Sequence, residues 1–482
     1  MTHDRPPGAR STLALCLAAA FTTLLDQSVL NTALPAIRSS LDAGPATLQW
    51  IIAGYSLTFG LALIPAGRLG DAYGRKWLFI AGMGVFCLGS VLGGTATQDW
   101  VVAVARLLQG VGAGTVNPQV LGLIQQHFTG RERTRALGAY ATVGGIAGVI
   151  GPLVGGTLLS GLGGIGGLGG ADGWRWVLLA SLPFGLLTIP AAIVWLPQSR
   201  PVTARRVSLD LPGIGLLALA TICLLLPFVL PAGQGPPRAL WLLALPPLLA
   251  LLIFWERRYT GLGRTPILLP ALTRSRSFTL GTLVAMFQFG SSLSASLALT
   301  LFLQDGLGWT PLRAALVTLP SALGFAVASS LSWRVVSRYG RISVVWALAG
   351  SLATLTGTVA VLLWAPERHL ALGLTLTQLL LGITNGLIIS PNQALTLAHA
   401  PAGAAGLAAG FLQVSQRISA TVCTAAVADL ALSAATGVTR TSAAYGLTVC
   451  CAMLALSATF AALDTRQPGP LPLTPPVHQK AR

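Results

Sequence analysis

Apolar runs of membrane-crossing length recur along the whole chain and alternate with short polar segments. A helix of about 20 apolar residues crosses a hydrocarbon core of about 30 Å, and the runs are too numerous to be one signal peptide or anchor. The pattern predicts an all-α integral membrane protein with fourteen transmembrane helices. They are expected at residues 12–34, 48–66, 77–97, 100–124, 137–160, 174–196, 211–230, 239–255, 278–302, 314–332, 342–364, 370–397, 404–432 and 443–463.

Two blocks of six spans share short sequence features. The tripeptide Tyr-Gly-Arg occurs at residues 73–75 and again at 339–341, after the second span of each block. The fourth and twelfth spans also end alike, in NPQVLGL and SPNQALTL. Such repeats, with a substrate path near the midplane between them, are typical of secondary transporters. We expect two pseudo-symmetric six-helix bundles and, from spans 7 and 8, an inserted two-helix hairpin.

The domain boundaries follow from this arrangement. The N-terminal bundle is expected at residues 1–200, the hairpin with a cytoplasmic linker at 201–275, and the C-terminal bundle at 276–464. The Pro-rich remainder, 465–482, is predicted to be a disordered cytoplasmic tail, because its composition favours an extended, unpacked chain.

Composition and charge agree with a membrane protein. Hydrophobic residues make up 53% of the chain and charged residues only 9%, against about 25% charged in soluble domains. The net charge of +17 would suggest nucleic acid in a soluble protein. With both termini placed in the cytoplasm, however, 22 of the 30 Lys and Arg fall in inner loops and tails, which is the positive-inside bias. We therefore expect a multi-pass protein of the cytoplasmic (inner) membrane and no nucleic-acid partner.

Metal, nucleotide and enzyme chemistry is not expected. The six cysteines lie in apolar spans without metal-ligand spacing and are interpreted as buried free thiols. The sequence contains no Walker-type phosphate loop. The glycines after Arg106 miss the third position of a dinucleotide loop and follow no strand, so Gly110 and Gly114 are interpreted as a GxxxG packing face. We therefore predict no cofactor, no metal site and no enzyme activity.

Charged residues inside the spans are the candidate functional groups. Asp26 interrupts the first apolar run, where a carboxylate costs about 2.5–3.5 kcal/mol on insertion scales. Arg106, in the fourth span, needs a counter-ion or a wet cavity, unless it reaches the outer interface near Asp99. Burial favours a protonated carboxyl and a nearby arginine opposes it, so this pair is expected to couple transport to protons. Asp429 in span 13 either joins that path or lies at the interface.

Uncharged polar residues and one further arginine in the spans are the candidate substrate contacts. Amides and a guanidinium can hydrogen-bond a small molecule, although bonds between helices are an equal alternative. The candidates are Asn31, Gln288, Asn385, Gln413 and Arg417.

The loop after the second span reads GRLGDAYGRK, and Asp71 is its only acid. The glycines permit a tight turn between helices. A carboxylate is favoured beside Arg75 or at a helix N-terminus. We interpret Asp71 as one half of a latch, whose partner across the domain interface is the uncapped start of span 13, after the inner loop 398–406.

A strip of glycines marks the fifth span. Gly144, Gly148, Gly151 and Gly155 fall on one helical face, so another helix can approach closely. Pro152 is expected to bend the helix at that contact. Generic small-residue packing would give the same strip.

Four motifs, in order along the chain, resemble those of the major facilitator superfamily. The loop resembles its signature after span 2, with Ala72 in place of a basic residue, and R-x-x-Q-G-x-G in span 4 resembles its span-4 motif. The fifth span is similar to the motif of its proton-driven exporters, which its importers lack, with Ala147 for one glycine. LLDQSVLNTALP in span 1 resembles the signature of the fourteen-span drug:proton antiporter family, with Ser28 for threonine. The matching residues are Asp26, Asn31 and Pro35; Gly67, Leu69, Gly70, Asp71, Gly74, Arg75 and Lys76; Arg106; and Gly138, Gly151, Pro152, Gly155 and Gly156.

The resemblance implies a monomer in the lipid bilayer that exports small amphipathic compounds in exchange for protons, by alternating access. In the family, the residues matching Gly67, Asp71, Gly74 and Arg75 latch the outward-facing state, and the span-4 arginine is implicated in proton coupling. The second loop copy has Ser337 where the acid stands, so only the first copy can make that latch. Three alternatives stay open: a dedicated exporter of one endogenous natural product, conferring self-resistance; a proton-coupled importer; and a membrane sensor.

Overall fold

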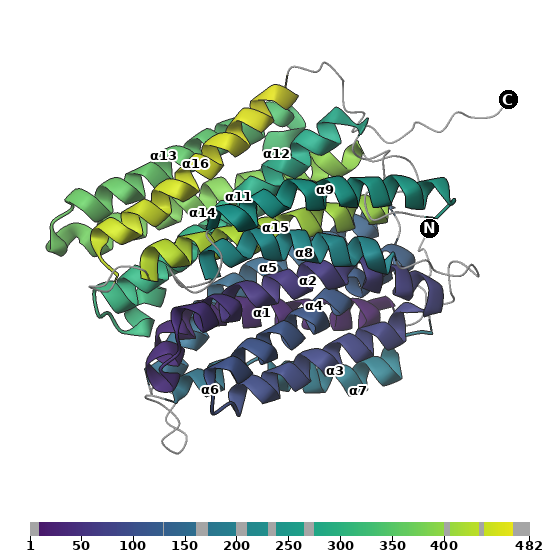
Figure 1. The fold of residues 1–482 in the computed structure, drawn as a ribbon, viewed down its shortest axis with the longest axis horizontal. Coiled ribbons are helices and arrows are strands. Elements are labelled where there is room, and N and C mark those ends of the chain that lie inside the picture. The colour runs from purple at the N-terminus through teal and green to yellow at the C-terminus, as the bar shows by residue number, and fades with distance from the viewer. Residues whose placement is uncertain are drawn as a thin grey trace.

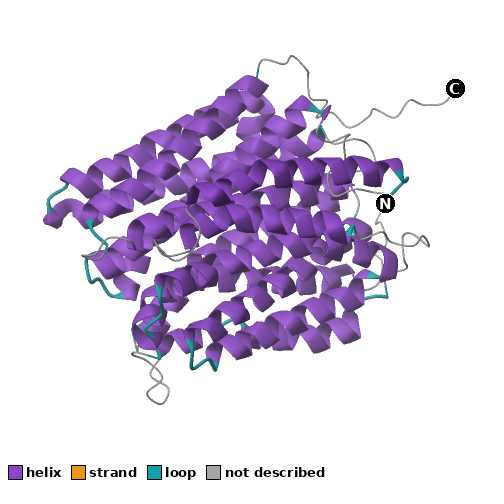
Figure 2. Ribbon diagram, in the orientation of Figure 1, coloured by secondary structure: helices purple, strands orange, loops and turns teal. Residues whose placement is uncertain are grey.

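The computed structural model describes residues 9–128, 130–160, 172–198, 210–229, 238–264, 274–399, 405–432 and 438–465. Within these ranges the chain consists of helices and short turns and contains no strand (Figure 2). The predicted disordered tail, from residue 466 onward, lies outside the described residues, and so do positions 400–404 of the inner loop before span 13.

Every predicted span coincides with a helical segment, which confirms the predicted fold class. Eleven of the segments are long and apolar enough to cross a membrane, by length and composition. The N-terminal half consists of α1 (Ala9–Leu41), α2 (Pro45–Tyr73), α3 (Arg75–Gly94), α4 (Asp99–His127), α5 (Gly130–Leu159), α6 (Gly173–Leu179) and α7 (Leu182–Trp195). The hairpin consists of α8 (Leu211–Val229) and α9 (Arg238–Gly261). The C-terminal half consists of α11 (Arg276–Leu301) with the π-helical turn η1 (Phe302–Gly306), α12 (Pro311–Tyr339), α13 (Arg341–Trp364), α14 (Glu367–Ala398), α15 (Ala405–Leu432) and α16 (Arg440–Asp464).

Each half packs mainly within itself, and the two halves meet along a seam (Figure 1). The main contacts across the seam join α2 to α15 and α5 to α12. These two pairs are related by the repeat, because α12 and α15 are the second and fifth spans of their half. In the hairpin, α9 packs on α8, and α8 touches both α2 and α15. The hairpin therefore lies against the seam, and the residue boundaries of the domains stay predictions.

The two Tyr-Gly-Arg copies have related backbone structure. Gly74 and Gly340 have φ values of +97° and +53°, in the region that favours glycine. Each glycine immediately precedes a helix, α3 in the first half and α13 in the second. The repeated tripeptide therefore marks the same sharp turn in both halves.

The arginines of the two copies reach equivalent helices. Arg75 donates to the carbonyl oxygen of Pro118 in α4 at 3.0 Å, and Arg341 donates to Asn392 Oδ1 in α14 at 2.7 Å. Although the second loop lacks an acid, Arg341 forms an ion pair with Asp464, at the end of α16, at 2.7 Å. The C-terminal half therefore takes its carboxylate from a distant helix.

Two glycines of α4 set a close crossing with α2. A Cβ atom on Gly110 would overlap the carbonyl oxygen of Tyr55, and one on Gly114 would overlap that of Phe59, both at under 3.0 Å. Backbone atoms cannot give way as a flexible side chain can, so the crossing requires glycine. The sequence predicted this GxxxG face, and the crossing lays Tyr55 against the part of α4 that carries Arg106.

The sixth span lies where it was predicted, as the membrane-length segment Gly173–Trp195. A short turn interrupts it, because α6 ends at Leu179 and α7 begins at Leu182. Pro183 explains the interruption, because it has no N–H to bond the carbonyl four residues earlier. The break places Ser181 inside the N-terminal half, where the residue is fully buried.

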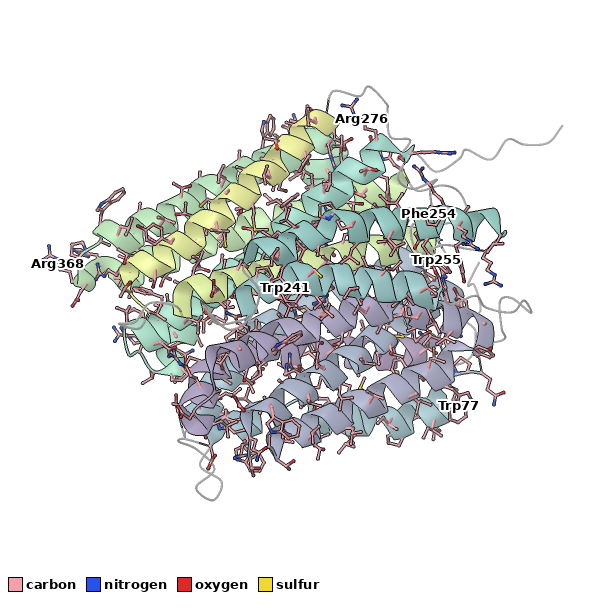
Figure 3. The ribbon with its side chains drawn as sticks, in the orientation of Figure 1. Trp77, Trp241, Phe254, Trp255, Arg276 and Arg368 are labelled. Carbon is pink, nitrogen blue, oxygen red and sulfur yellow. The ribbon has the colours of Figure 1, made fainter. Side chains whose placement is uncertain are left out.

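The outward face of the bundle is apolar. Leu187, Trp195 and Leu243 are 72%, 59% and 67% exposed, which suits lipid chains rather than water. Figure 3 shows Arg276 and Arg368, near the starts of α11 and α14, at opposite ends of the bundle. Charged side chains thus lie at the helix ends while the middle of the surface is hydrocarbon.

Candidate functional site

Asp26 of α1 and Arg106 of α4 form a buried ion pair. Arg106 Nη1 lies 2.6 Å from Asp26 Oδ2, and the two side chains are 1% and 2% exposed. Arg106 is therefore not an interfacial arginine that reaches solvent near Asp99. Breaking such a pair costs about 3–5 kcal/mol, because one charge is left buried without compensation.

Three neutral side chains complete the surroundings of the pair. Gln109 accepts from Arg106 Nη1 at 2.6 Å and donates through Nε2 to Asp26 Oδ1 at 3.0 Å. The same Nε2 lies 2.9 Å from Ser90 Oγ of α3. Ser181, at the α6–α7 break, donates its hydroxyl to Asp26 Oδ1 at 3.5 Å. The carboxylate is therefore held by α4 and by the broken sixth span together.

The aromatic ring of Tyr55 covers the guanidinium of Arg106. Arg106 Cζ lies 4.4 Å from the ring centroid, a cation–π distance. Tyr55 in turn donates its hydroxyl to the carbonyl oxygen of Thr23 at 3.4 Å. If the Asp26 charge is removed, Arg106 keeps the contacts with Gln109 and Tyr55.

A cavity lies beside this pair, between the two halves. It is partly open and, in this conformation, has room for water molecules rather than for a whole drug-sized compound. Toward one end the halves meet through Arg38 and Asp305, whose Nη1 and Oδ2 are 3.7 Å apart. The lining residues are Gln27, Leu30, Asn31, Ile52, Tyr55, Ser56, Arg106, Leu293, Leu297 and Thr424.

Arg417 of α15 reaches across the seam into the N-terminal half. Its Nη1 donates to Gln27 Oε1 of α1 at 3.0 Å. Its Cζ lies 4.0 Å from the ring centroid of Phe59 and 5.4 Å from that of Phe289. Gly60 of α2 leaves room for the side chain, because a Cβ there would lie 3.0 Å from Arg417 Cβ. Among the substrate candidates, Arg417 is the one that contacts both halves.

Two of the other substrate candidates bind each other. Gln288 Nε2 donates to Asn385 Oδ1 at 3.0 Å, and Asn385 Nδ2 donates to Ser292 Oγ at 3.3 Å. Both amides are buried, at 1% and 8% exposure. This geometry favours the alternative that they hold α11 and α14 together.

The remaining candidates are separate from the ion pair. Asn31 lines the cavity. Gln413 and Asp429 are half-buried on α15, and the hydrogen-bond and ion-pair partners described above for Asp26 and Arg106 do not include them. A role of Asp429 in proton coupling stays a prediction.

Asp71 lies in the last turn of α2, where a loop was predicted, and pairs with Arg75, the first residue of α3. Gly70 lies against α4, because a Cβ there would overlap the side-chain amide of Gln119, and Gly67 lies near Pro118 of the same helix. The partner expected for Asp71 is the start of span 13. Residues 400–404, which lead into that span, lie outside the described residues. The latch therefore stays a prediction.

The glycine strip of α5 packs partly on α1. A Cβ on Gly155 would lie 3.1 Å from Thr32 Cβ, and one on Gly151 would lie 2.5 Å from Ser28 Cβ. Both contacts fall within two turns of Asp26 along α1. These two glycines therefore set how closely α5 approaches the helix that carries the carboxylate.

Two other glycines of the span-5 motif and strip do not pack on α1 in the same way. Gly156 faces the other half, because a Cβ there would lie 2.8 Å from Leu312 Cα of α12, whereas Gly148 has nothing within 4 Å. Pro152 and Gly138 lie within α5, which continues through both residues. The predicted face therefore packs on α1 within its half, and Gly156, which lies off that face, makes a separate contact across the seam.

Three residues of the ion-pair network were not among the predicted site residues: Gln109, Ser90 and Ser181. Gln109 could have been found, because it lies one turn after Arg106 and so shares its helical face. The two serines gave no signal, since single serines are common in apolar helices.

The family model of the Major Facilitator Superfamily matches residues 16–424 of the chain. A crystal structure of a D-xylose–proton symporter has a similar fold, with a TM-score of 0.66 over 94% of this chain and 97% of that one. Sequence identity to that symporter is 14%, so the likeness concerns the fold alone.

Proteins with similar sequences are named for antibiotic transport or resistance. The probable actinorhodin transporter of Streptomyces coelicolor is 36% identical over 88% of this chain and 73% of its own length. The puromycin resistance protein pur8 of Streptomyces alboniger is 33% identical over 84% of this chain and 78% of its own. The tetracenomycin C resistance and export protein of Streptomyces glaucescens is 30% identical over 90% and 80%.

Proposed function

We propose, since the chain belongs to the Major Facilitator Superfamily, that it exports small amphipathic compounds across the cytoplasmic membrane in exchange for protons. The chain is a multi-pass membrane transporter related to drug and antibiotic efflux proteins. The outward direction, the coupling to protons and the amphipathic class of substrate are the proposal.

The ion pair of Asp26 and Arg106 beside the cavity carries this proposal. A proton on Asp26 removes the charge of the carboxylate, so the ion pair with Arg106 becomes a weaker hydrogen bond from a cation to a neutral carboxyl group, and α1 is then bound less firmly to α4. Two conformations that differ in this contact respond to the proton by shifting population. The lining of the adjacent cavity mixes amides and hydroxyls with leucines, which suits an amphipathic compound.

Two further observations support export. The span-5 glycines match the exporter motif and pack on the helix that carries Asp26. Inward proton movement supplies the energy, at about 2.3 kcal/mol per elementary charge for each 100 mV.

Everted membrane vesicles that contain the protein test the proposal. A compound to which expression confers resistance is expected to accumulate in energised vesicles and to discharge the pH gradient, and an uncoupler abolishes both effects. Accumulation of that compound in energised intact cells would instead mean import. Resistance without any movement into vesicles contradicts transport.

The names of the relatives favour a second candidate, a dedicated exporter of one endogenous natural product. Two of them are named for moving a single compound, actinorhodin and tetracenomycin C. A deletion strain that becomes sensitive to one compound of a broad panel supports this candidate. Sensitivity to many unrelated compounds supports multidrug efflux.

Both termini are predicted to be cytoplasmic, because 22 of the 30 basic residues fall on one side in that frame. An alkaline phosphatase fused after residue 482 is expected to be inactive, and a fluorescent protein at the same site to be bright. Fusions after residue 368, in a predicted outer loop, are the control and should give the reverse. Active phosphatase at the C-terminus contradicts the topology.

Asp71→Asn is predicted to insert normally and to export several-fold more slowly. The substitution removes the charge that pairs with Arg75 and that the latch requires, while Asp71 is 48% exposed and adds little to stability. Efflux is measured at equal expression, with Ser337→Asn in the second loop copy as the control. Parental efflux by Asp71→Asn would show that the acid latches nothing.

A further inference from the structure

We propose that the transported compound is an organic anion, whose charged group binds Arg417 at the seam between the halves. This inference rests on the proposed function and names the substrate class of that same cavity. The observation behind it is that Arg417 has no counter-ion among the described residues.

Arg417 differs from the other enclosed arginines in having no acid. Arg106 pairs with Asp26 at 2.6 Å and Arg341 pairs with Asp464 at 2.7 Å. Arg417 is surrounded by the amide of Gln27 and by two aromatic rings. In the described part of the chain, the ion pairs of the structure do not include Arg417. A guanidinium at this depth without an acid beside it is suited to take an anion from outside the protein.

Arg417 is not itself a lining residue of the cavity, but it lies next to one. Its partner Gln27 lines the cavity, and so does Thr424. Thr424 lies seven residues after Arg417, on the same face of α15. The side chain is half-buried rather than closed off. The cavity and Arg417 therefore share one wall.

The guanidinium has hydrogen-bond donors to spare. A guanidinium carries five N–H groups in a planar fork, and Arg417 uses one on Gln27. The rings of Phe59 and Phe289 fix the fork without neutralising it. Such a fork binds a carboxylate or sulfonate through two parallel hydrogen bonds, while the lining leucines contact the apolar body of the same molecule.

The net charge of the cavity and its surroundings follows from Asp26, Arg106 and Arg417. None of the lining residues is acidic, and the charge of Arg106 is balanced by Asp26. With an anion bound, Asp26, Arg106, Arg417 and the anion sum to zero; with Asp26 protonated and the anion gone, they sum to two positive charges. The inside-negative potential therefore draws the proton-loaded form inward and does not oppose the outward step of the anion-loaded form. One proton in and one monovalent anion out move two charges per cycle.

The test uses two probes that differ in charge alone. Dansylate is an amphipathic sulfonate, and dansylamide is the same ring system with a neutral sulfonamide. Binding to the full chain in lipid nanodiscs is followed by energy transfer from tryptophan, without any gradient. We expect dansylate to bind at least about tenfold more tightly than dansylamide, the size of one charge-assisted contact.

Three variants assign that preference to one side chain. Arg417→Gln is expected to weaken dansylate binding by about tenfold and to leave dansylamide binding unchanged. Arg417→Lys keeps the positive charge and is expected to recover part of the dansylate affinity that Arg417→Gln loses. The comparison of the two variants separates the effect of charge from that of packing. Arg313→Gln removes an exposed arginine of α12 and is the matched control, with binding as in the parent.

The outcomes separate this inference from the proposed function. Dansylate binding that depends on Arg417 supports the anion site. If energised vesicles then fail to accumulate dansylate, the result contradicts export and leaves the anion site standing. Equal affinity of the parent for the two probes, binding of neither, or unchanged dansylate binding in Arg417→Gln overturns the anion site, whether or not other compounds are exported.

Discussion

The Asp26→Asn variant is expected to fold, to insert and to lose uphill export. Asparagine is nearly isosteric with aspartate and cannot carry a proton, so the ion pair can no longer be made and broken. The neutral asparagine resembles protonated Asp26. Because protonated Asp26 occurs in each cycle of a proton-coupled transporter, the folded protein is expected to tolerate a neutral side chain there. Arg106 retains Gln109 and the ring of Tyr55 as partners.

Everted vesicles provide the measurement. Substrate accumulation against a gradient should fall to equilibration, and substrate should no longer discharge the pH gradient, while binding without a gradient persists. Asp305→Asn makes the same chemical change in the seam pair with Arg38 and should keep uphill export. Undiminished proton-coupled export by Asp26→Asn would move the proton site elsewhere, with Asp429 the next residue to replace.

The Gly110→Ala variant is expected to be the most damaging single methyl addition near the site. The new Cβ would overlap the carbonyl oxygen of Tyr55, and overpacking of this kind costs about 1–3 kcal/mol. The separation of α2 and α4 that this forces also moves Tyr55 away from Arg106. The yield of monodisperse protein and its melting temperature should therefore both fall, and export with them.

Gly84→Ala is the matched control for that variant. Gly84 lies within α3 with nothing within 4 Å of an added Cβ, and alanine is favoured over glycine in a helix by up to about 1 kcal/mol. The control should be as stable as the parent or slightly more so. Equal melting temperatures for Gly110→Ala and Gly84→Ala would mean that the crossing of α2 and α4 is looser than the structure has it.

The sequence was sufficient for the helices because the signal for them is local. Each span carries its own apolar run, and its length is set by the membrane, so all fourteen segments fell where the pattern placed them. The repeat was also readable, since Gly74 and Gly340 make the same turn in both halves. The sixth span is likewise one apolar segment of membrane length, but its composition gave no sign of the short turn before Pro183 that divides it into two helices.

The candidate site could be predicted only in its charged members. Asp26 and Arg106 stood out because each is costly in a membrane without a partner, and that argument paired them correctly. Ser90 and Ser181 carry no such cost and gave no signal, and Gln109 stood out only as the glutamine of the span-4 motif. Gln288 and Asn385 were also predicted as candidates because they are polar residues within spans. In the structure they hydrogen-bond to each other.

By itself, then, the sequence determined that the chain is an all-helical membrane protein with fourteen helical segments in two related halves, and which buried charges need partners. The tertiary structure decided which partner each charge has. Asp464 joins Arg341 from the far end of the chain, and Arg417 meets Gln27 and two aromatic rings instead of an acid. The physical reason is that lipid is as apolar as the helix surfaces, so hydrophobicity fixes insertion but not rotation. Rotation is set by close packing, as where Gly110 and Gly114 allow α4 to touch α2.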